Sequence, residues 1–589
     1  MRYWPGLIPS PTDPTPPSQP VWLRALPWLA VTLLYTAGTF AYFWPLPRLW
    51  QDHVGPDLGD PVFCLYVLKW GVHQIGLGMP DFWNANIFYP TRGVLAFSEH
   101  LIGPAAQLFL FLKIVPNAIA GFNFLFLSSF VGCALSVCWV LRKSGLSWAA
   151  AVLGGWMYAF SCFRLSHVAH LQMLLAQWIP VTLWFWDRLL ARRTLKNAAL
   201  FLLFYLLNLT GACYLAYMIH FALLGIFLSR WAAEGRDLFS VRSLRILLPV
   251  VLVAGMVGAA LFLPYVRISR SQGLSRPQAE IEVYGARLAS YFSPSDVSFY
   301  FTETADRRLH AILGQSADLF RRPENSLFAG FLPTIFFFVG AFAALRRSRE
   351  GPADPWARGL ALSGLICFAL SFARVYVLLA EIVPGLSGMR VPARFYTFVS
   401  LPLVYFAARG VDVLLRRIPG YPARAALVAS LALVLAVELA PRQLPWERLP
   451  REEELPGAYA WIRDEPSVKS LVELPIFNDG RESYYVYRAT FHWKPIANGY
   501  SGYTPPSYEE LASHIRFLPN PHGFELLRRR GISHLVVHAR KPKRRQAVQE
   551  WEERFSAGPE RQMERVYREQ GISIYRLLDR PGPHNSLSK

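Results

Sequence analysis

The stretch WQDHVGPDLGD, residues 50–60, is polar, is punctuated by glycine and proline, and carries Asp52, Asp57 and Asp60. It follows the apolar segment Leu26–Trp44 and precedes an almost unbroken series of further apolar segments. Carboxylates in such a loop lie against a bilayer, where charged groups are costly and tend to be functional. The side of the membrane on which this loop lies therefore decides its interpretation.

The composition indicates a membrane protein with many spans. Hydrophobic residues make up 53% of the 589 residues and charged residues 17%, whereas soluble domains are about one-quarter charged. The net charge is +20. Because the arginines fall mainly between apolar segments, this charge is explained by the positive-inside rule and argues against nucleic-acid binding. The six cysteines have no zinc-site spacing, and we interpret them as small buried residues.

Hydropathy predicts about eleven transmembrane helices within residues 22–440, at about 20 residues per crossing. The predicted spans are Leu26–Trp44, Ala118–Leu141, Ser147–Ser161, Leu171–Leu190, Asn197–Thr210, Cys213–Leu228, Leu244–Pro264, Leu327–Leu345, Ala357–Phe372, Phe395–Val413 and Arg424–Ala440. Residues 1–21 are rich in proline, serine and threonine, so we expect a disordered cytoplasmic tail.

Charge alternation predicts the orientation. With the N-terminus inside, every second short connection is basic, as in Arg142-Lys143. To keep this alternation we interpret Leu101–Val115, which contains Pro104, as an interfacial or re-entrant helix. The outer face then receives the first loop (residues 45–117), a second large loop (265–326) and the C-terminal region, and the protein is predicted in the inner (plasma) membrane.

The C-terminal region, residues 441–589, changes character. Charged helical stretches alternate there with strand-like segments, among them the pair Met563–Tyr567 and Ile572–Leu577 across a turn. This pattern predicts a soluble extracytoplasmic α/β domain. The expected fold is thus an all-α polytopic membrane domain with interfacial helices in its first outer loop, followed by an α/β domain.

Asp57 and Asp60 are the candidate catalytic groups. An exposed carboxylate at the outer membrane boundary can act as a general base or bind a metal. The alternative is that Asp60, which precedes Pro61, caps a helix that begins there. The spacing alone favours neither role, and the two can coexist.

Three further groups of residues are candidates for binding. The aromatic and amide-rich segment of the first loop is typical of carbohydrate contacts, although an interfacial helix with an aromatic belt explains it equally. Its candidate sugar- or acceptor-binding residues are Asn86, Tyr89, Arg92, Glu99 and His100. Arginines on an outer connection oppose the positive-inside rule unless they bind an anion such as phosphate or reach lipid headgroups. The candidate lipid-phosphate-binding residues are Arg164, His167, His170, Arg390 and Arg394.

From Leu26 to Ala440 the chain resembles the GT-C superfamily of polytopic glycosyltransferases, which includes protein O-mannosyltransferases and lipid A aminoarabinose transferases. The resemblance rests on the first span, the outer loop with Asp57-x-x-Asp60, the interfacial helices and the many later spans. The stretch Arg390-Val-Pro-Ala-Arg394-Phe and the soluble C-terminal domain resemble bacterial members. The chain departs from the superfamily in having no Asp-Glu pair in this loop and no Trp-Trp-Asp motif, which leaves substrate and metal dependence open.

The resemblance implies an inverting glycosyltransferase that moves a sugar from a polyprenyl-phosphate-type donor to a glycan, lipid or protein acceptor. It implies a role for Asp60 first and Asp57 second as base or acceptor ligand, and no cofactor is expected. The alternatives are a transporter or flippase of lipid-linked sugars, which would carry charges in mid-span, and a non-catalytic accessory protein of envelope polysaccharide assembly.

Overall fold

The computed structural model describes residues 21–313, 323–350, 354–477, 479–516, 518, 520–539, 542–556, 561–569 and 571–579. The tail predicted for residues 1–21 lies outside these residues except for Val21, so that prediction is not tested.

Helices occupy all eleven predicted spans. They are α1 (Val21–Tyr42), α5 (Ala118–Lys143), α6 (Trp148–Ala159), α9 (Ile179–Ala191), α10 (Leu195–Leu209), α11 (Cys213–Glu234), α12 (Val241–Gln272), α15 (Phe331–Glu350), α16 (Pro355–Ser371), α18 (Tyr396–Arg417) and α19 (Tyr421–Glu438). Within the described residues, six of them are long and apolar enough to cross a membrane, namely α1, α5, α11, α12, α18 and α19. A helix satisfies its own backbone hydrogen bonds, which is why apolar stretches take this form in a bilayer.

Two predicted spans have wrong bounds. The segment Leu171–Leu190 is broken into the turn α8 (Leu171–Leu174) and the 13-residue helix α9, which begins next to Pro180. Proline fits the first turn of a helix because it lacks the amide hydrogen that is unpaired there. Conversely, α12 continues through Pro264 to Gln272, and neighbouring groups in membrane helices are known to accommodate such prolines.

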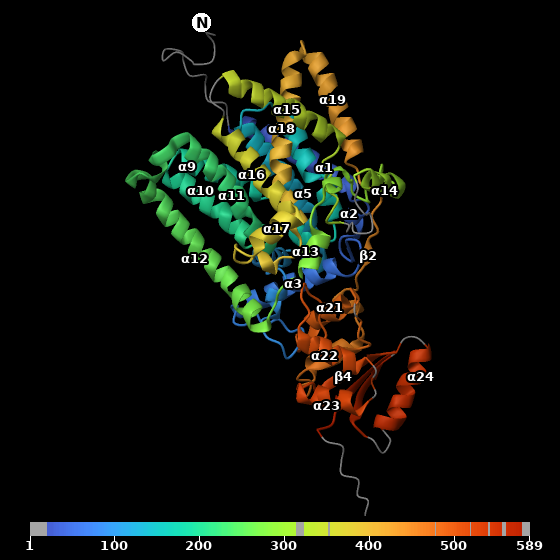
Figure 1. The fold of residues 1–589 in the computed structure, drawn as a ribbon. Coiled ribbons are helices and arrows are strands. Elements are labelled where there is room, and N and C mark those ends of the chain that lie inside the picture. Colours follow the sequence, from blue (N-terminus) through green and yellow to red (C-terminus); the bar gives the residue numbers. More distant parts are fainter. Residues whose placement is uncertain are drawn as a thin grey trace, which may run out of the picture.

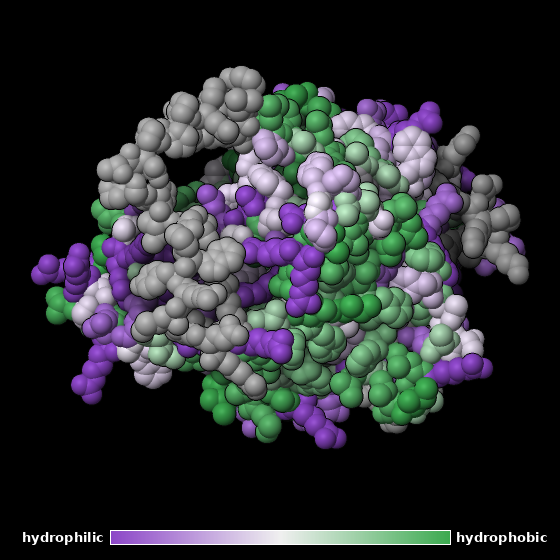
Figure 2. Space-filling view, turned by 90° about the horizontal axis from the view of Figure 1, so that it is seen from above, coloured by the Kyte–Doolittle hydropathy of each residue, from purple (hydrophilic) through white to green (hydrophobic). Residues whose placement is uncertain are grey.

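The helices pack into a bundle with α12 along one side (Figure 1). In α12 and in α19, only 11% of the 18-residue apolar segment is buried inside the protein. In Figure 2, seen from the end that carries the basic connections, hydrophobic residues cover much of the centre and the lower right of the visible face. These outward apolar surfaces suit contact with lipid chains.

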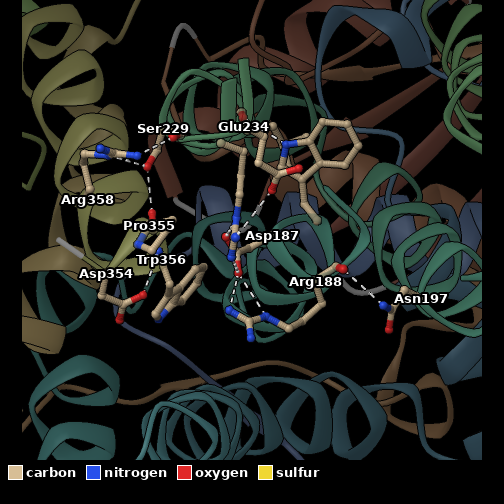
Figure 3. A network of polar contacts seen from close by, with 12 residues as sticks. Asp187, Arg188, Asn197, Ser229, Glu234, Asp354, Pro355, Trp356 and Arg358 are labelled. Atoms are coloured by element: carbon tan, nitrogen blue, oxygen red, sulfur yellow. Dashed lines mark hydrogen bonds and ion pairs between the residues drawn. The ribbon is translucent and has the colours of Figure 1, made fainter. Parts of the chain in front are cut away.

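The basic connections gather at one end of the bundle, where an ion network joins three helices (Figure 3). The buried carboxylate of Asp187, at the end of α9, accepts hydrogen bonds from Nε and Nη2 of Arg230 in α11 at 2.6 and 2.7 Å. Arg358 in α16 donates to the carbonyl of Ser229 at 2.7 Å. Asp187 thus holds helix ends together.

The acids Asp412 and Glu438 also hold helix ends. Asp412 in α18 accepts a hydrogen bond from the amide of Ser147 at 3.0 Å, at the start of α6. Glu438, the last residue of α19, accepts hydrogen bonds from the amides of Phe331 and Leu332 at the start of α15. With Asp187, these acids occupy span ends, as the sequence predicts, rather than the mid-span positions expected of a transporter.

The loops at the opposite end contain short elements. The first loop holds α2 (Leu46–Leu49), β1 (His53–Val54), α3 (Asp60–Leu77), η1 (Val94–Phe97) and α4 (Ile102–Leu112). The second large loop and the shorter connections hold α7 (Cys162–Ser166), α13 (Gln278–Tyr284), η3 (Leu288–Phe292), α14 (Glu303–Ile312), α17 (Ala373–Ala380), η5 (Leu386–Gly388) and η6 (Pro392–Phe395). At about 16 Å, α4 is too short to span a bilayer, in line with the interpretation of Leu101–Val115.

The C-terminal region is an α/β unit. Its elements are β2 (Glu447–Arg448), η7 (Glu452–Glu454), α20 (Gly457–Asp464), β3 (Leu471–Leu474), α21 (Glu482–His492), α22 (Pro506–Ile515), α23 (Pro521–Arg529), β4 (His534–His538), α24 (Pro542–Trp551), the π-helical turn η8 (Glu552–Ser556), β5 (Met563–Glu569) and β6 (Ile572–Leu577). The sheet order is β3-β4-β6-β5, with β3 parallel to β4 and the other pairs antiparallel. The predicted hairpin is confirmed as β5 and β6.

The C-terminal unit is joined to the first loop by backbone pairing. Strand β1 pairs with β2, and the amides of Phe88 and Tyr89 donate to the carbonyls of Asn498 and Ile496 at 3.0 Å each. In Figure 1 this unit lies directly below α3. The division at residue 440 stays a prediction, but the two predicted domains share one interface.

Candidate active site

Asp60 lies where three distant segments meet. It is the first residue of α3, and its Oδ2 lies 2.9 Å from Nε2 of His170, in the turn between α7 and α8. Its Oδ1 accepts a 2.7 Å hydrogen bond from the hydroxyl of Tyr500 in the C-terminal unit. The cap position of α3 is taken by Gly59, and no side-chain cap is formed there. The capping interpretation of Asp60 is therefore wrong, because its carboxylate binds His170 and Tyr500 instead.

The surroundings hold Asp60 in its ionised form. Burial by itself raises the pKa of Asp60, but the hydrogen bond and charge of His170, the hydrogen bond from Tyr500 and the charge of Arg394 outweigh it and lower the pKa below its ordinary value. The side chain nevertheless keeps 33% of its exposure. Asp60 is thus an accessible carboxylate that stays charged.

The turn before α3 is held in place by contacts with the C-terminal unit. Asp57 has a positive φ of 67° and accepts a 2.7 Å hydrogen bond from the amide of Gly59. Ser483 donates to the carbonyl of Leu58. A Cβ on Gly480 would lie 3.2 Å from Cα of Gly59, so this close approach favours glycine. The C-terminal unit therefore helps to fix the backbone that carries Asp60.

Asp57 and Asp60 differ in electrostatics although they are three residues apart. Burial raises the pKa of Asp57, against the hydrogen bond from Gly59, and the charge of Asp60 raises it further. Paired carboxylates whose pKa values move in opposite directions are a common arrangement at acid–base sites. Asp57 shapes the turn, and Asp60 presents the charge.

His170 keeps one ring nitrogen without a partner. Nε2 of His170 faces the Asp60 carboxylate at 2.9 Å, and Nδ1 points away from it. Within the described residues, Nδ1 is buried and makes no hydrogen bond. The His167 ring lies 5.3 Å from the His170 ring, so the two histidines are neighbours, although they lie in a turn rather than on one helix face.

Behind the histidines lies a buried ion pair that the sequence did not predict. Glu324 accepts from Nε and Nη2 of Arg394 at 3.1 and 2.5 Å, and it lies 3.0 Å from Nε2 of His167. Both members of the pair keep less than 10% side-chain exposure. Burial raises the pKa of Glu324, but Arg394 and His167 together hold it well below its ordinary value. The donors of Arg394 are thus already bound by a protein carboxylate.

Arg390 is the more accessible of the two predicted phosphate-binding arginines. Its side chain is 36% exposed and lies 3.0 Å from Glu280. Arg276 contacts the same Glu280 and lies 3.4 Å above the ring of Tyr503, and the hydroxyl of Tyr503 donates to the carbonyl of Gly388 at 2.9 Å. The segment that carries Tyr500 and Tyr503 therefore connects the Asp60 cluster with the Arg390 cluster.

Arg164 has a structural role. Its guanidinium donates to the carbonyls of Ala159 and Leu174 at 3.0 Å each and of Ser129 at 3.4 Å. The residue is buried. The phosphate-binding hypothesis for Arg164 is therefore not supported, because its donors satisfy carbonyls within the protein.

The predicted sugar-binding residues are mostly part of the framework. Asn86 bonds Tyr66 and the carbonyls of Ala489 and Lys494, and the amide of Tyr89 pairs with Ile496. Glu99 accepts from the amides of Cys213 and Tyr214, and His100 lies 2.9 Å from the carbonyl of Leu209. Burial raises the pKa of Glu99 to about 7 and lowers that of His100 to about 4. Only Arg92 is exposed.

Sequence reasoning missed Glu324 and Glu280, and it gave only a weak indication of Tyr500. Glu324 is an acid in a long loop with no informative spacing to its partners. The signal for Tyr500 was the glycine-rich stretch Asn498–Tyr503, which is also typical of an ordinary turn. Among the described residues, no three His, Cys, Asp or Glu side chains gather closely enough to hold a metal ion.

Neither a family model nor a curated protein matches the chain. Several solved structures are similar to it, among them the following three. The oligosaccharyltransferase of Archaeoglobus fulgidus is 14% identical, with a TM-score of 0.47, over 88% of this chain and 70% of that one. ArnT from Cupriavidus metallidurans is 10% identical, with a TM-score of 0.46, over 94% of this chain and 99% of that one. The arabinofuranosyltransferase AftD from Mycobacteria is 14% identical, with a TM-score of 0.48, over 95% of this chain and 42% of that one.

Because each identity is 14% or less and each TM-score is below 0.5, no activity and no residue's role is taken from these structures.

Proposed function

We propose that the chain is a membrane glycosyltransferase that moves a sugar from a polyprenyl-phosphate-type donor to an acceptor hydroxyl of an envelope glycan, lipid or protein. The observation that carries this proposal is the accessible, ionised carboxylate of Asp60 between His170 and Tyr500. It lies at the end of the bundle opposite the basic connections, next to a cluster of arginines.

Asp60 would serve as the base of an inverting displacement. The acceptor oxygen forms a bond to the anomeric carbon while the bond from that carbon to the phosphate oxygen breaks. The phosphate leaves with the electron pair of that bond, and Asp60 takes the acceptor proton. Because a carboxylate offers about four lone-pair positions, the acceptor hydroxyl has room beside the two donors already present.

Arg390 is the better candidate for holding the departing phosphate. Its exposure allows contact with a lipid headgroup, whereas Arg394 is already bound by Glu324. Cations placed where negative charge develops stabilise the transition state. Arg394 would contribute through its charge, which already acts on Asp60.

The expected orientation is an active site at the outer face of the inner membrane. The basic connections lie at one end of the bundle, and the positive-inside rule favours that end as the cytoplasmic one. Asp60 and the C-terminal unit would then be extracytoplasmic, and donor and acceptor would meet there.

Replacing Asp60 by asparagine tests the proposal. The Asp60→Asn variant keeps the size of the side chain but cannot take the proton, so we expect transfer from a labelled lipid-linked sugar in membranes to be lost, by about 100-fold or more. The matched control is Asp52→Asn in the same loop, where Asp52 faces His53 at 2.7 Å. Undiminished transfer by a correctly folded Asp60→Asn variant would overturn the proposal.

A further inference from the structure

Helices α15, α16 and α18 line much of an open cavity of about 1240 Å³. Helices α15 and α18 cross at Gly340 and Gly410, where a Cβ on either glycine would overlap the backbone of the other helix. Small residues allow such close crossings in membranes. Helix α16 packs on α18 where Gly364 meets Pro402. Both α15 and α16 pack on α18, and the cavity occupies the space left between α15 and α16.

The polarity of the cavity changes along its length. Towards the Asp60 end of the bundle it is lined by apolar residues and by Tyr291 and Thr334, and alanines and aromatic rings line its middle. Within the described residues, its charged lining side chains all lie at the other end, near the basic connections. They are Asp354, Arg358, Arg409, Asp412 and Arg416. A ligand that fits this lining has an apolar body and a charged group at one end.

The two carboxylates at the charged end are already bound. Asp354 accepts a 3.1 Å hydrogen bond from the amide of Trp356. Asp412 accepts from the amide of Ser147 and from Arg416. Neither carboxylate therefore needs a bound cation. The arginines at this end determine the charge of a ligand that fits the cavity.

Arg409 is the arginine that remains available. It is half-buried in the cavity wall, and it makes no hydrogen bond or ion pair with any side chain in the described part of the chain. A cation at the edge of an apolar membrane cavity is costly unless an anion accompanies it. Arg358, although bound to Ser229, lines the same end.

We propose that this cavity binds an anionic glycerophospholipid, with its phosphate at Arg409 and its acyl chains between α15 and α16. A zwitterionic lipid satisfies the apolar wall but brings no net charge for Arg409. A polyprenyl phosphate oriented towards Asp60 would place its phosphate at the end where the described lining holds no cation. The site lies at the opposite end of the bundle from Asp60 and is separate from the proposed transfer reaction.

The test uses the full-length protein purified in a neutral detergent and depleted of lipid. Dioleoyl phosphatidylglycerol, dioleoyl phosphatidylcholine and undecaprenyl phosphate are each titrated in. Bound lipid is counted by native mass spectrometry, and the thermal midpoint is followed in parallel. We expect phosphatidylglycerol to be retained and to raise the midpoint, and phosphatidylcholine to bind at least about tenfold more weakly, as loss of a charge-assisted bond implies.

Three variants locate the site. Arg409→Ala is expected to weaken phosphatidylglycerol binding about tenfold. Arg417→Ala is the control: Arg417 is the last residue of α18 and does not line the cavity, so binding should stay unchanged. Ala361→Phe fills the cavity from α16 and should exclude the acyl chains, which keeps the test valid if Arg409→Ala does not fold. Equal binding of the two phospholipids, or unchanged binding by both Arg409→Ala and Ala361→Phe, would overturn the proposal. So would preferential binding of undecaprenyl phosphate in the cavity.

The outcome is independent of the transferase. Asp60→Asn is expected to bind phosphatidylglycerol like the unmodified protein, because Asp60 does not line the cavity. Loss of transfer with retained lipid binding, or the reverse, shows which of the two proposals has failed.

Discussion

Asp60 owes its ionised state to residues that are remote in the chain, since Tyr500 lies 440 positions away. Two donors on one carboxylate stabilise its charge more than a single exposed contact does. The same two donors occupy its oxygens in the absence of an acceptor. The reactivity of Asp60 is therefore set jointly by the first loop, the α7–α8 turn and the C-terminal unit.

Removing the hydroxyl of Tyr500 should change the pH dependence of transfer. The Tyr500 hydrogen bond lowers the pKa of Asp60, so Tyr500→Phe raises this pKa, and the acid limb of kcat/KM moves to higher pH. A depressed pKa stabilises the folded state above the unfolded pKa, and this stabilisation is lost as pH falls through the folded pKa. The Tyr500→Phe variant therefore keeps less of this stabilisation.

The measurement for Tyr500→Phe is a profile of kcat/KM from about pH 4 to 7, the range in which carboxylates and histidines titrate. Tyr503→Phe is the control, because Tyr503 bonds Gly388 and not Asp60. A purely structural role of Tyr500 would lower kcat/KM without moving the acid limb.

Breaking the Glu324 ion pair should destabilise the protein strongly. Glu324→Gln leaves Arg394 buried without its counter-ion, and such losses cost about 3–5 kcal/mol. The control is Glu303→Gln, which removes the pair with Arg307 whose side chains are 71% and 67% exposed, at a cost of at most about 1 kcal/mol. Thermal unfolding in detergent compares the two variants, and equal midpoints would contradict the prediction.

At the scale of elements, glycines decide which helices touch. Gly340 and Gly410 bring the backbones of α15 and α18 into contact, and this leaves the cavity beside α16. Hydropathy does not report such contacts, because a lipid-facing and a helix-facing apolar residue look the same in sequence. It predicted the positions of the helices and could not predict their partners.

Gly340→Ala should lower stability, because the added methyl group would overlap the carbonyl of Phe406 and overpacking costs about 1–3 kcal/mol. Gly255→Ala on α12 is the matched control, since a Cβ there meets nothing within 4 Å. That change should be neutral or stabilising by up to about 1 kcal/mol, as alanine favours helix over glycine. The thermal midpoints of both variants and of the unmodified protein are measured in the same detergent. A Gly340→Ala variant that is more stable than the unmodified protein would refute the predicted contact.

At the scale of the whole molecule, the C-terminal unit is part of the site rather than an appendage. It pairs with the first loop through β1 and β2 and through the backbone of Phe88 and Tyr89. It also holds the turn before α3 through Ser483. The membrane bundle and the α/β unit therefore meet at the residue proposed to act as the base.

Cutting the chain between the two parts should not separate them. With a protease site inserted after Gln443, we expect the cleaved C-terminal fragment to stay with the membranes in high salt, because backbone pairing and apolar contacts are not screened by ions. Immunoblotting of pellet and supernatant measures this. Phe88→Asp, which places a charge in the buried interface beside Tyr508, should release the fragment. Release of the fragment from the cleaved protein without the Phe88→Asp change would contradict the predicted interface between the two parts.

The sequence by itself determined the helical positions, the end of the bundle at which basic residues gather and the β5–β6 hairpin. These features follow from local properties, namely hydropathy, charge alternation and turn residues, which act within about 20 residues. Only the tertiary structure decided that Asp60 does not cap its helix, that Glu324 binds Arg394, that Arg164 serves the framework and that Tyr500 completes the site. Each of these depends on hydrogen bonds between segments far apart in the chain, and local sequence pattern contains no record of such contacts.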